Sequence, residues 1–232
     1  AEDISHMFSF CSTLITIQIQ NFDTSKVKNM NGLFQECYSL QFLNVSILNT
    51  QNVEDMSFMF QDCSALTSLD VSKFETGNVR NMTGMFMGCS ALKILDVSNF
   101  DTKNTEDMTT MFQFVSGVTI LNVEKFNTKK VKSMTGMFQY CRSLKTLDVS
   151  NFDTSSVTDM SSMFEETDTT SLSVGKFDTS KVTNMKNMFA YNKVLKSLDV
   201  SKFDTSKVTD MSFMFLECTS LISLNLSNFQ TQ

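Results

Sequence analysis

The chain has 232 residues, a formal net charge of −6 and a hydrophobic content of 41%. This acidic balance argues against nucleic acid as a partner, because proteins that bind nucleic acids present a basic face to the phosphates. No apolar run approaches the roughly 20 residues that a membrane-spanning helix needs, so we expect no direct membrane insertion of this segment.

Methionine and phenylalanine recur at fixed places along the chain. One methionine marks each repeat, at Met30, Met56, Met82, Met108, Met134, Met160, Met185 and Met211. The step is 26 residues, apart from one step of 25, and a period in this range is typical of a solenoid. We therefore interpret the many Met and Phe residues as a stacked core, and a methionine-rich metal or ligand site is the weaker alternative.

We expect residues 1–232 to form a single solenoid domain. The first repeat is partial, at 1–24, an irregular repeat lies around 157–179, and the last repeat is truncated at 229–232. Neither end has the polar capping repeat that solenoids normally need. We expect further repeats in the parent protein, and packing of the ends against another chain is the alternative.

Each repeat changes its apolar period part-way through. From Val27 to Leu40 the apolar residues follow one another at steps of three, three, one, three and three, which is the stripe of one helical face. From Leu43 to Val45 the step is two, the period of a strand. The sequence therefore predicts an α/β repeat of about nine 26-residue units, with a parallel β-sheet on one face and short helices on the other.

Two columns of the repeat never change. The threonine column comprises Thr24, Thr50, Thr76, Thr102, Thr128, Thr154, Thr179, Thr205 and Thr231. Each threonine up to Thr205 precedes an expected helix, so we interpret the column as helix caps; the alternative is an exposed ladder that binds ice or glycan. The phenylalanine column comprises Phe8, Phe34, Phe60, Phe86, Phe112, Phe138, Phe164, Phe189 and Phe215. We interpret it as core packing.

Two repeats depart from the pattern. In the fifth, Thr105 stands in place of valine and Val115 in place of cysteine. In the seventh, the polar segment from Glu165 to Thr170 replaces a segment that carries Cys and Leu, and it is one residue shorter. We expect a local bulge or bend there, either as a tolerated defect or as a feature that faces a ligand.

The cysteines all lie three residues after the invariant phenylalanine, at Cys11, Cys37, Cys63, Cys89, Cys141 and Cys218. Stacked repeats would bring neighbouring Cα atoms to about 5 Å, which is within disulfide range. Side chains in a ladder point the same way, however, so we interpret the cysteines as buried free thiols. The lone His6 has no partnered nucleophile or carboxylate and gives little support for catalysis.

The run Met-Phe-x-x-Cys-x-x-Leu-x-x-Leu-x-Val, at 59–71 and 137–149, resembles the BspA-like leucine-rich repeat. Together with Phe-Asp-Thr-Ser-x-Val-x-x-Met, at 152–160 and 203–211, it is similar to the subgroup common in bacterial and mollicute surface lipoproteins. The resemblance covers essentially the whole chain. It implies a right-handed leucine-rich-repeat-like solenoid at the cell surface, associated with adhesion and host-protein binding, and it supplies no catalytic residues.

One residue of each expected strand lies between two inward positions and faces out. The candidate binding face comprises Asn44, Asp70, Asp96, Asn122, Asp148, Asp199 and Asn225, with the apolar pair Ile94 and Ile120 beside them. Since neighbouring strands lie about 4.8 Å apart, these side chains would form a polar stripe suited to a protein loop or a glycan. The alternative is a solvated sheet whose carboxylates prevent lateral aggregation. Calcium prefers six to eight oxygens, and single carboxylates with flanking hydroxyls supply few of them.

The sequence therefore predicts a non-enzymatic binding or adhesion module at the cell surface. Its expected partner is a host or cell-surface protein or glycan, and we expect no cofactor. The alternative is a structural stalk or an array that self-associates through its repeat ends. An enzyme is disfavoured because the sequence contains no nucleophile elbow, phosphate loop, zinc spacing or paired catalytic carboxylates.

Overall fold

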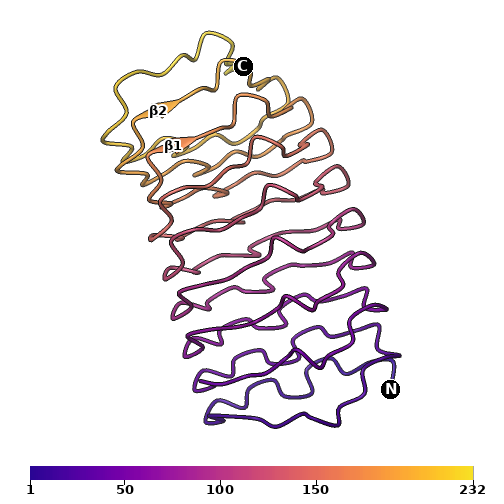
Figure 1. Cartoon of the computed structure of the whole chain (residues 1–232). Coiled ribbons are helices and arrows are strands. Elements are labelled where there is room, and N and C mark those ends of the chain that lie inside the picture. The colour runs from indigo at the N-terminus through magenta and orange to yellow at the C-terminus, as the bar shows by residue number, and fades with distance from the viewer. Residues whose placement is uncertain (232) are drawn as a thin grey trace.

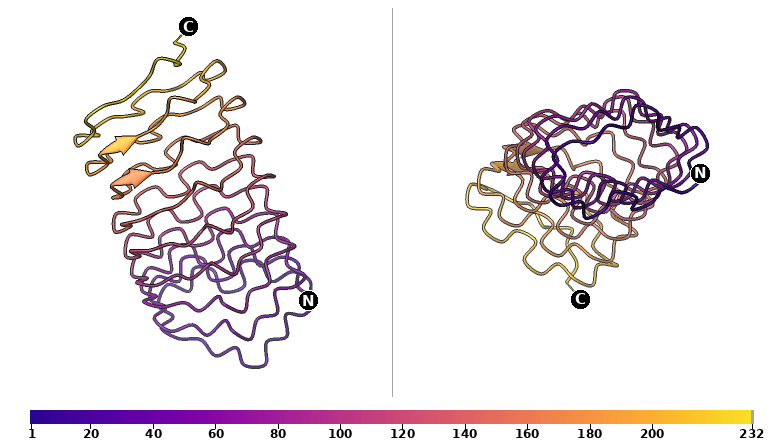
Figure 2. Two further views of the ribbon diagram at one scale, coloured as in Figure 1. Left: turned by 45° about the horizontal axis from the view of Figure 1, so that its top comes forward. Right: turned by 90° about the horizontal axis from the view of Figure 1, so that it is seen from below.

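The computed structural model describes residues 1–231, which form a stack of coils. Each coil ends at a residue of the threonine column, and the nine coils span 1–24, 25–50, 51–76, 77–102, 103–128, 129–154, 155–179, 180–205 and 206–231. Figure 1 shows the coils lying one above another between the N-terminal and the C-terminal end. Seen from below in Figure 2, the coils appear as flattened loops that shift progressively along the stack.

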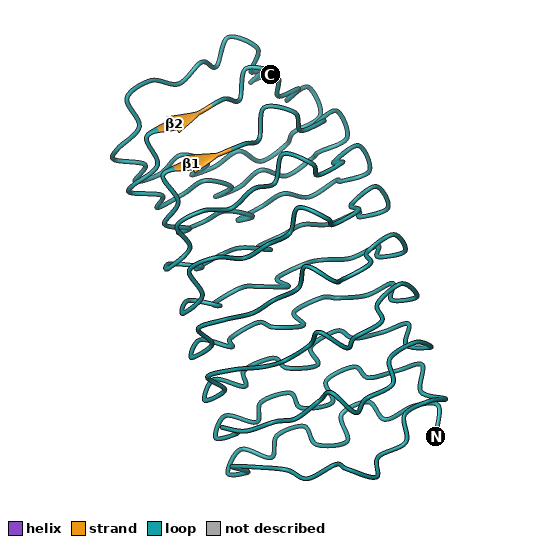
Figure 3. Cartoon of the chain, in the orientation of Figure 1, coloured by secondary structure: helices purple, strands orange, loops and turns teal. Residues whose placement is uncertain are grey.

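The described residues contain no helix and only two strands, β1 (Ser171–Leu172) and β2 (Ser197–Leu198). The strands pair in parallel, with Ser171 opposite Ser197 and Leu172 opposite Leu198. Figure 3 shows that loops and turns make up the rest. The predicted α/β fold, a right-handed leucine-rich-repeat-like solenoid with short helices on one face and a parallel β-sheet on the other, is therefore wrong. The repeat itself is confirmed.

Two lines of parallel bridges couple successive coils. One follows the columns of the expected strands, where Ser68 pairs with Ile94 and Ile120 with Thr146. The other line joins Asp3, Asn29, Asp55, Asn81, Asp107, Ser133, Asp159, Asn184 and Asp210. Apart from the β1–β2 pair, each bridge is isolated, so the coils run parallel at these points without forming extended strands.

Alternate backbone amides point along the stack in the segments that were expected to be helical. The Phe34 amide donates to the Met59 carbonyl of the next coil at 2.9 Å, whereas the Gln35 amide donates to the Gly32 carbonyl within its own coil at 3.0 Å. An α-helix would instead direct each amide to the carbonyl four residues earlier. Half of the amides therefore hold neighbouring coils together, and the other half close tight turns.

Left-handed residues produce this alternation. Gly32 and Glu36 have φ angles of 58° and 57°. The column of Gly32 comprises His6, Gly32, Phe58, Gly84, Thr110, Gly136, Ser162, Asn187 and Phe213, and all are left-handed. The column of Glu36, equally left-handed, comprises Phe10, Glu36, Asp62, Gly88, Phe114, Tyr140, Glu166, Tyr191 and Glu217. Because a right-handed helix cannot include a left-handed residue every four positions, the apolar steps of three and four reflect consecutive turns with the same inward direction.

The core is a continuous ladder of side chains between the two long sides of the coils. The rings of the invariant phenylalanines stack with centroids 5.5 to 5.9 Å apart and interplanar angles of 4° to 11°. Phe34, Phe60, Phe86, Phe112, Phe138, Phe164 and Phe189 are fully buried. The interpretation of this column as packing is confirmed, and each ring adds both apolar burial and aromatic contact.

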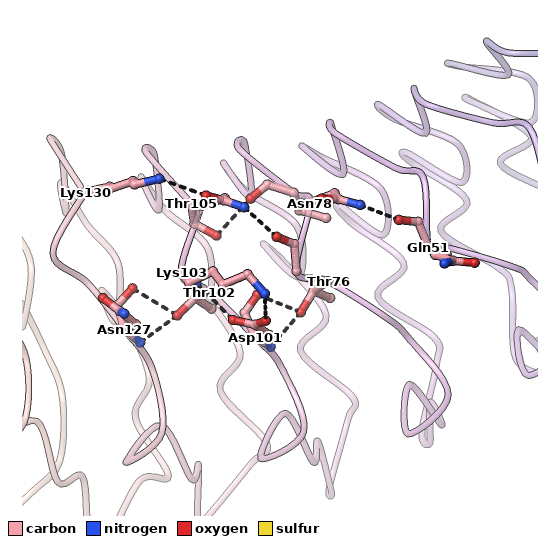
Figure 4. A network of polar contacts seen from close by, with 12 residues as sticks. Gln51, Thr76, Asn78, Asp101, Thr102, Lys103, Thr105, Asn127 and Lys130 are labelled. Carbon is pink, nitrogen blue, oxygen red and sulfur yellow. Dashed lines mark hydrogen bonds and ion pairs between the residues drawn. The ribbon is translucent and has the colours of Figure 1, made fainter.

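The threonine column does not cap helices. The Thr102 hydroxyl donates to the Asn127 carbonyl at 3.1 Å and accepts from the Asn127 amide at 2.7 Å, so it ties its coil to the next (Figure 4). Thr76 makes the same pair of bonds to Asp101. These threonines are buried, with exposed fractions of 1% to 2% from Thr24 to Thr205. The helix-cap interpretation is therefore wrong, and the described column offers no exposed threonine ladder before Thr231.

The short seventh coil keeps its place in the stack despite its polar segment. The hydroxyl of Thr167 donates a hydrogen bond to the Phe138 carbonyl at 3.0 Å. One coil earlier, the thiol of Cys141 donates the equivalent hydrogen bond to the Phe112 carbonyl. Thr169 is fully buried, and its hydroxyl has no hydrogen-bond partner among residues 1–231. Threonine hydroxyls thus replace the sulfur and aliphatic groups of the other coils, and the hydroxyl of Thr169 makes no hydrogen bond within the described residues.

Candidate functional site

The polar residues of the candidate binding face lie in one exposed row, one per coil. Leu69 and Val71 have exposed fractions of 6% and 1%, and Asp70 between them is exposed. The same alternation exposes Asn44, Asp96, Asn122, Asp148, Asp199 and Asn225. Ser173 interrupts the row in the seventh coil. Their predicted exposure is observed, and their role in binding stays a prediction.

Each side chain of this row also closes a turn in its own backbone. The Ser98 amide donates to Oδ1 of Asp96 at 2.9 Å, and the Ser201 amide donates to Oδ1 of Asp199 at 3.0 Å. Equivalent bonds are made at Asn44, Asp70, Asn122, Asp148 and Asn225. These are Asx turns, in which a side chain two residues earlier satisfies the amide. One carboxylate oxygen is thus used structurally, and the other is left for a ligand.

The turn bonds keep the carboxylates ionised. Hydrogen bonds from the hydroxyl and amide of Ser72 lower the pKa of Asp70, and those of Ser98 lower the pKa of Asp96. The pKa of Asp199 is lowered by Ser201 in the same way and further by the nearby charge of Lys202. A carboxylate that accepts hydrogen bonds is favoured in its charged form. The row is therefore negatively charged at neutral pH.

Ile94 and Ile120 lie beside the row in adjacent coils and are 74% and 68% exposed. Their backbones belong to the first line of bridges, so both side chains project from the same side as the polar row. Phe42, in the same column two coils before Ile94, is 68% exposed. Sequence reasoning did not include Phe42, although its column could have been read from the 26-residue spacing.

A hollow lies at the C-terminal part of this face. It has a volume of about 740 Å³ and is lined by residues of four coils, among them Ser173, Gly175, Lys176, Asp199 and Lys202. Ser150, Ser171, Ser197, Ser223 and Asn225 contribute further polar groups. Its size falls within the range of pockets that bind small ligands. Of the predicted face residues, Asp199 and Asn225 line it.

Glycine in the seventh coil opens this hollow. Gly175 occupies the position of Ser150 and Ser201 in the neighbouring coils. A Cβ atom at Gly175 would lie 3.0 Å from Oδ2 of Asp199. Since Oδ1 of Asp199 already accepts from Ser201, the absent side chain uncovers the carboxylate oxygen that the turn does not use.

The cysteine thiols belong mainly to the core of the coils. All six cysteines are free, and Cys37, Cys63, Cys89 and Cys141 are buried. Burial raises the pKa of Cys37 to about 11 and that of Cys141 to about 12. The prediction of free buried thiols is confirmed at these four positions, whereas Cys11 is exposed and Cys218 is partly exposed.

One known protein family matches this chain repeatedly along its length. The model of the family described as "Mycoplasma protein of unknown function, DUF285" matches residues 2–120, 67–168, 92–193 and 145–232 in four overlapping segments. The chain belongs to the DUF285 family. No curated protein matches it.

This DUF285 chain has no helix, within residues 1–231, that is long and apolar enough to cross a membrane. The same residues contain no group of three or more His, Cys, Asp or Glu side chains placed to hold a metal ion. What sequence reasoning missed in this DUF285 chain is the hollow, with Gly175, Lys176 and Lys202. Two sequence signals could have located it: the shortened seventh repeat, and lysines in two successive repeats of one column.

Proposed function

We propose that the chain is a non-enzymatic binding module that presents the exposed row of Asx side chains and the adjoining hollow to an extracellular partner. The observation that carries this proposal is that the two oxygens of each carboxylate in the row have different roles, as Asp96 shows. Its Oδ1 fixes the local turn through the Ser98 amide, and its Oδ2 remains accessible on an exposed side chain. A partner would thus meet charged groups held in place by the backbone, with little loss of side-chain freedom on binding.

Two further features support this function. The exposed apolar pair Ile94 and Ile120 lies next to the charged row, and an apolar patch rimmed by polar groups is typical of interaction surfaces. The motif resemblance to BspA-like repeats, which are associated with cell surfaces and adhesion, favours a place outside the cell. In this proposal the chain is extracellular or displayed at the cell surface, and the partner is a host or cell-surface molecule.

A binding screen against extracellular proteins and glycans tests this proposal. The informative variant changes Asp70, Asp96, Asp148 and Asp199 to Asn together. Asparagine keeps the Oδ1 acceptor of each turn, as Asn44 and Asn122 show in this chain, and removes the charge. The proposal expects a partner that binds the original chain and is lost by this variant.

A matched control changes Asp55, Asp107, Asp159 and Asp210 to Asn. These residues also accept an amide two residues later, but they belong to the second line of bridges. The control removes the same charge and should retain the partner. A partner that both variants lose, or that both retain, contradicts placement of the site on the row.

A second candidate function is self-association through the ends of this polypeptide, and a specific observation favours it. The amides of Met211, Phe213, Phe215 and Glu217 have no partner among residues 1–231. Their equivalents one coil earlier, at Met185, Asn187, Phe189 and Tyr191, all donate to the ninth coil. The carbonyls of Asp3, Ser5, Met7 and Ser9 in the first coil are likewise unused in the described chain. The two end faces are thus complementary in donors and acceptors.

Light scattering over a range of concentrations tests this second function. End-to-end association predicts a mass that rises with concentration without any other ligand. Replacement of Phe213, which is 57% exposed on the last coil, by Glu should keep the chain monomeric. A mass that stays at one chain throughout eliminates this candidate.

A further inference from the structure

The hollow on the face combines two lysines in a way that no other place in their column does. The column comprises Asn21, Ile47, Lys73, Asn99, Lys125, Asn151, Lys176, Lys202 and Asn228. Lys73 and Lys125 are separated from each other and from Lys176 by asparagines, whereas Lys176 and Lys202 follow in neighbouring coils. Both line the hollow. Neither takes part in an ion pair among residues 1–231.

Two ammonium groups in neighbouring coils repel each other, although each lies near a carboxylate of the row: beyond the turn hydrogen bonds, the charge of Lys176 lowers the pKa of Asp148, and that of Lys202 lowers the pKa of Asp199. Parallel segments in register are about 4.8 Å apart, and like charges at a separation of this order repel each other. Another column avoids such repulsion because its charges alternate in sign from coil to coil. It comprises Glu2, Lys28, Glu54, Arg80, Glu106 and Lys132, and the Lys132 ammonium lies 2.5 Å from the Glu106 carboxylate. The pair in the hollow lacks that alternation, so its arrangement is suited to a bound anionic group.

The remainder of the hollow suits hydroxyl groups. Ser171, Ser197 and Ser223 line the hollow and belong to the column that holds Ile94 and Ile120 earlier in the chain. Because serine is smaller than isoleucine and carries a hydroxyl, this part of the hollow is open and polar. Oδ2 of Asp199 is uncovered by Gly175 and can accept from a ligand hydroxyl. Asn225 adds an amide at the rim. Hydroxyls, an amide and a carboxylate beside two cations match a sugar that carries an acidic group.

We propose that this hollow binds an acidic sugar residue of a glycan, with Lys176 and Lys202 holding its anionic group and Asp199, Ser173 and Asn225 contacting its hydroxyls. The inference rests on the proposed function, since it names the ligand class for one part of the same face. The anionic group is a carboxylate or a sulfate, and the same two ammonium groups would bind either.

Isothermal titration calorimetry on the full 232-residue chain tests this site with three tetrasaccharides. One is a galacturonic acid tetramer, which carries carboxylates, one is a heparin-derived tetrasaccharide, which carries sulfates, and one is neutral cellotetraose. We expect at least one acidic sugar to bind about tenfold or more tightly than the neutral one. Comparison of the two acidic sugars identifies the anionic group. Equal binding of all three overturns the proposal.

Two variants locate the binding. K176Q/K202Q should weaken the acidic sugar by about tenfold or more, because it removes both cations. The matched control K73Q/K125Q removes two lysines of the same column outside the hollow and should leave the affinity unchanged. A similar loss in both variants indicates a general charge effect and overturns the site.

A third variant tests the shape of the hollow without changing its charge. Gly175→Ser restores the residue of the neighbouring coils and covers Oδ2 of Asp199, so it should also weaken binding. Unchanged urea unfolding shows that each variant is folded. If no tetrasaccharide binds while the four-Asn variant of the row still loses the partner found in the screen, this inference fails and the proposed function stands.

Discussion

Thr102 and Asn127, which are 25 residues apart in the sequence, share two hydrogen bonds between adjacent coils. The hydroxyl donates to the Asn127 carbonyl at 3.1 Å and accepts from its amide at 2.7 Å. A single buried hydroxyl thus satisfies both backbone groups of a residue in the next coil. The repetition of this pair along the stack explains why threonine never varies in its column within this chain.

Thr102→Val should destabilise the chain by about 1–3 kcal/mol, because the isosteric side chain leaves the Asn127 amide and carbonyl without their partner. Urea unfolding measures the change. Thr102→Ser keeps the hydroxyl and should lose less, and Thr119→Val, at an exposed position, should have little effect. Equal stability of Thr102→Val and the original chain would show that the pair is dispensable.

Stability should fall between neutral pH and about pH 3. The pKa is lowered at Asp3, Asp23, Asp70, Asp96, Asp101, Asp148, Asp153, Asp178, Asp199, Asp204 and Asp210, in each case chiefly by hydrogen bonds from the residue two positions later. A depressed pKa in the folded state stabilises the fold above the unfolded value of about 3.9, and this contribution is lost as the pH falls through the folded pKa. The urea midpoint at constant ionic strength should therefore be lower at pH 3 than at pH 7. A midpoint that is unchanged or higher at pH 3 contradicts the structural role of these turns.

Thiol labelling should distinguish the cysteines by burial. Cys11 is exposed and should react first with iodoacetamide in the folded chain, whereas Cys63, Cys89 and Cys141 should react only after unfolding in urea. Burial raises their pKa and suppresses the reactive thiolate. Peptide mass spectrometry after timed labelling gives the rates. Comparable rates at Cys11 and Cys89 in the folded chain would be inconsistent with this core.

Gly84→Ala should be strongly destabilising because Gly84 has a φ of 57° and an added Cβ would lie 2.6 Å from Cδ1 of Phe58. The left-handed conformation alone costs about 1–2 kcal/mol for a residue with a side chain. Gly77→Ala is the control in the same coil. Its Cβ would meet mainly the ends of the Asp101 and Lys103 side chains, which can move. Thermal unfolding should show a clear loss for Gly84→Ala and a small one for Gly77→Ala, and the reverse order would contradict the turn geometry.

The 26-residue period made the inward and outward columns predictable. It placed Phe86 and Cys89 in the core and Asp70 and Asp96 outside, as observed. Columns depend only on spacing, and stacked coils of any local conformation share them. The positions of the candidate face could thus be derived without knowing the backbone.

The local conformation could not be derived in this way. Phe114 and Tyr140 are left-handed, although aromatic residues rarely adopt that conformation and glycine is its usual signal. Contacts between coils impose it, because the amides of these residues donate to carbonyls 25 residues later. A pattern read along one repeat cannot report such bonds. The expected helices and the expected threonine caps failed for the same reason.

The most direct measurement of the central claim is carbodiimide labelling of carboxylates, with and without the partner recovered in the screen, read by mass spectrometry. We predict that the partner protects Asp70, Asp96, Asp148 and Asp199 and leaves Asp55, Asp107 and Asp210 at their original labelling rates. Protection of the second group with the first unchanged would place the partner elsewhere and contradict the claim that the exposed row is the binding face.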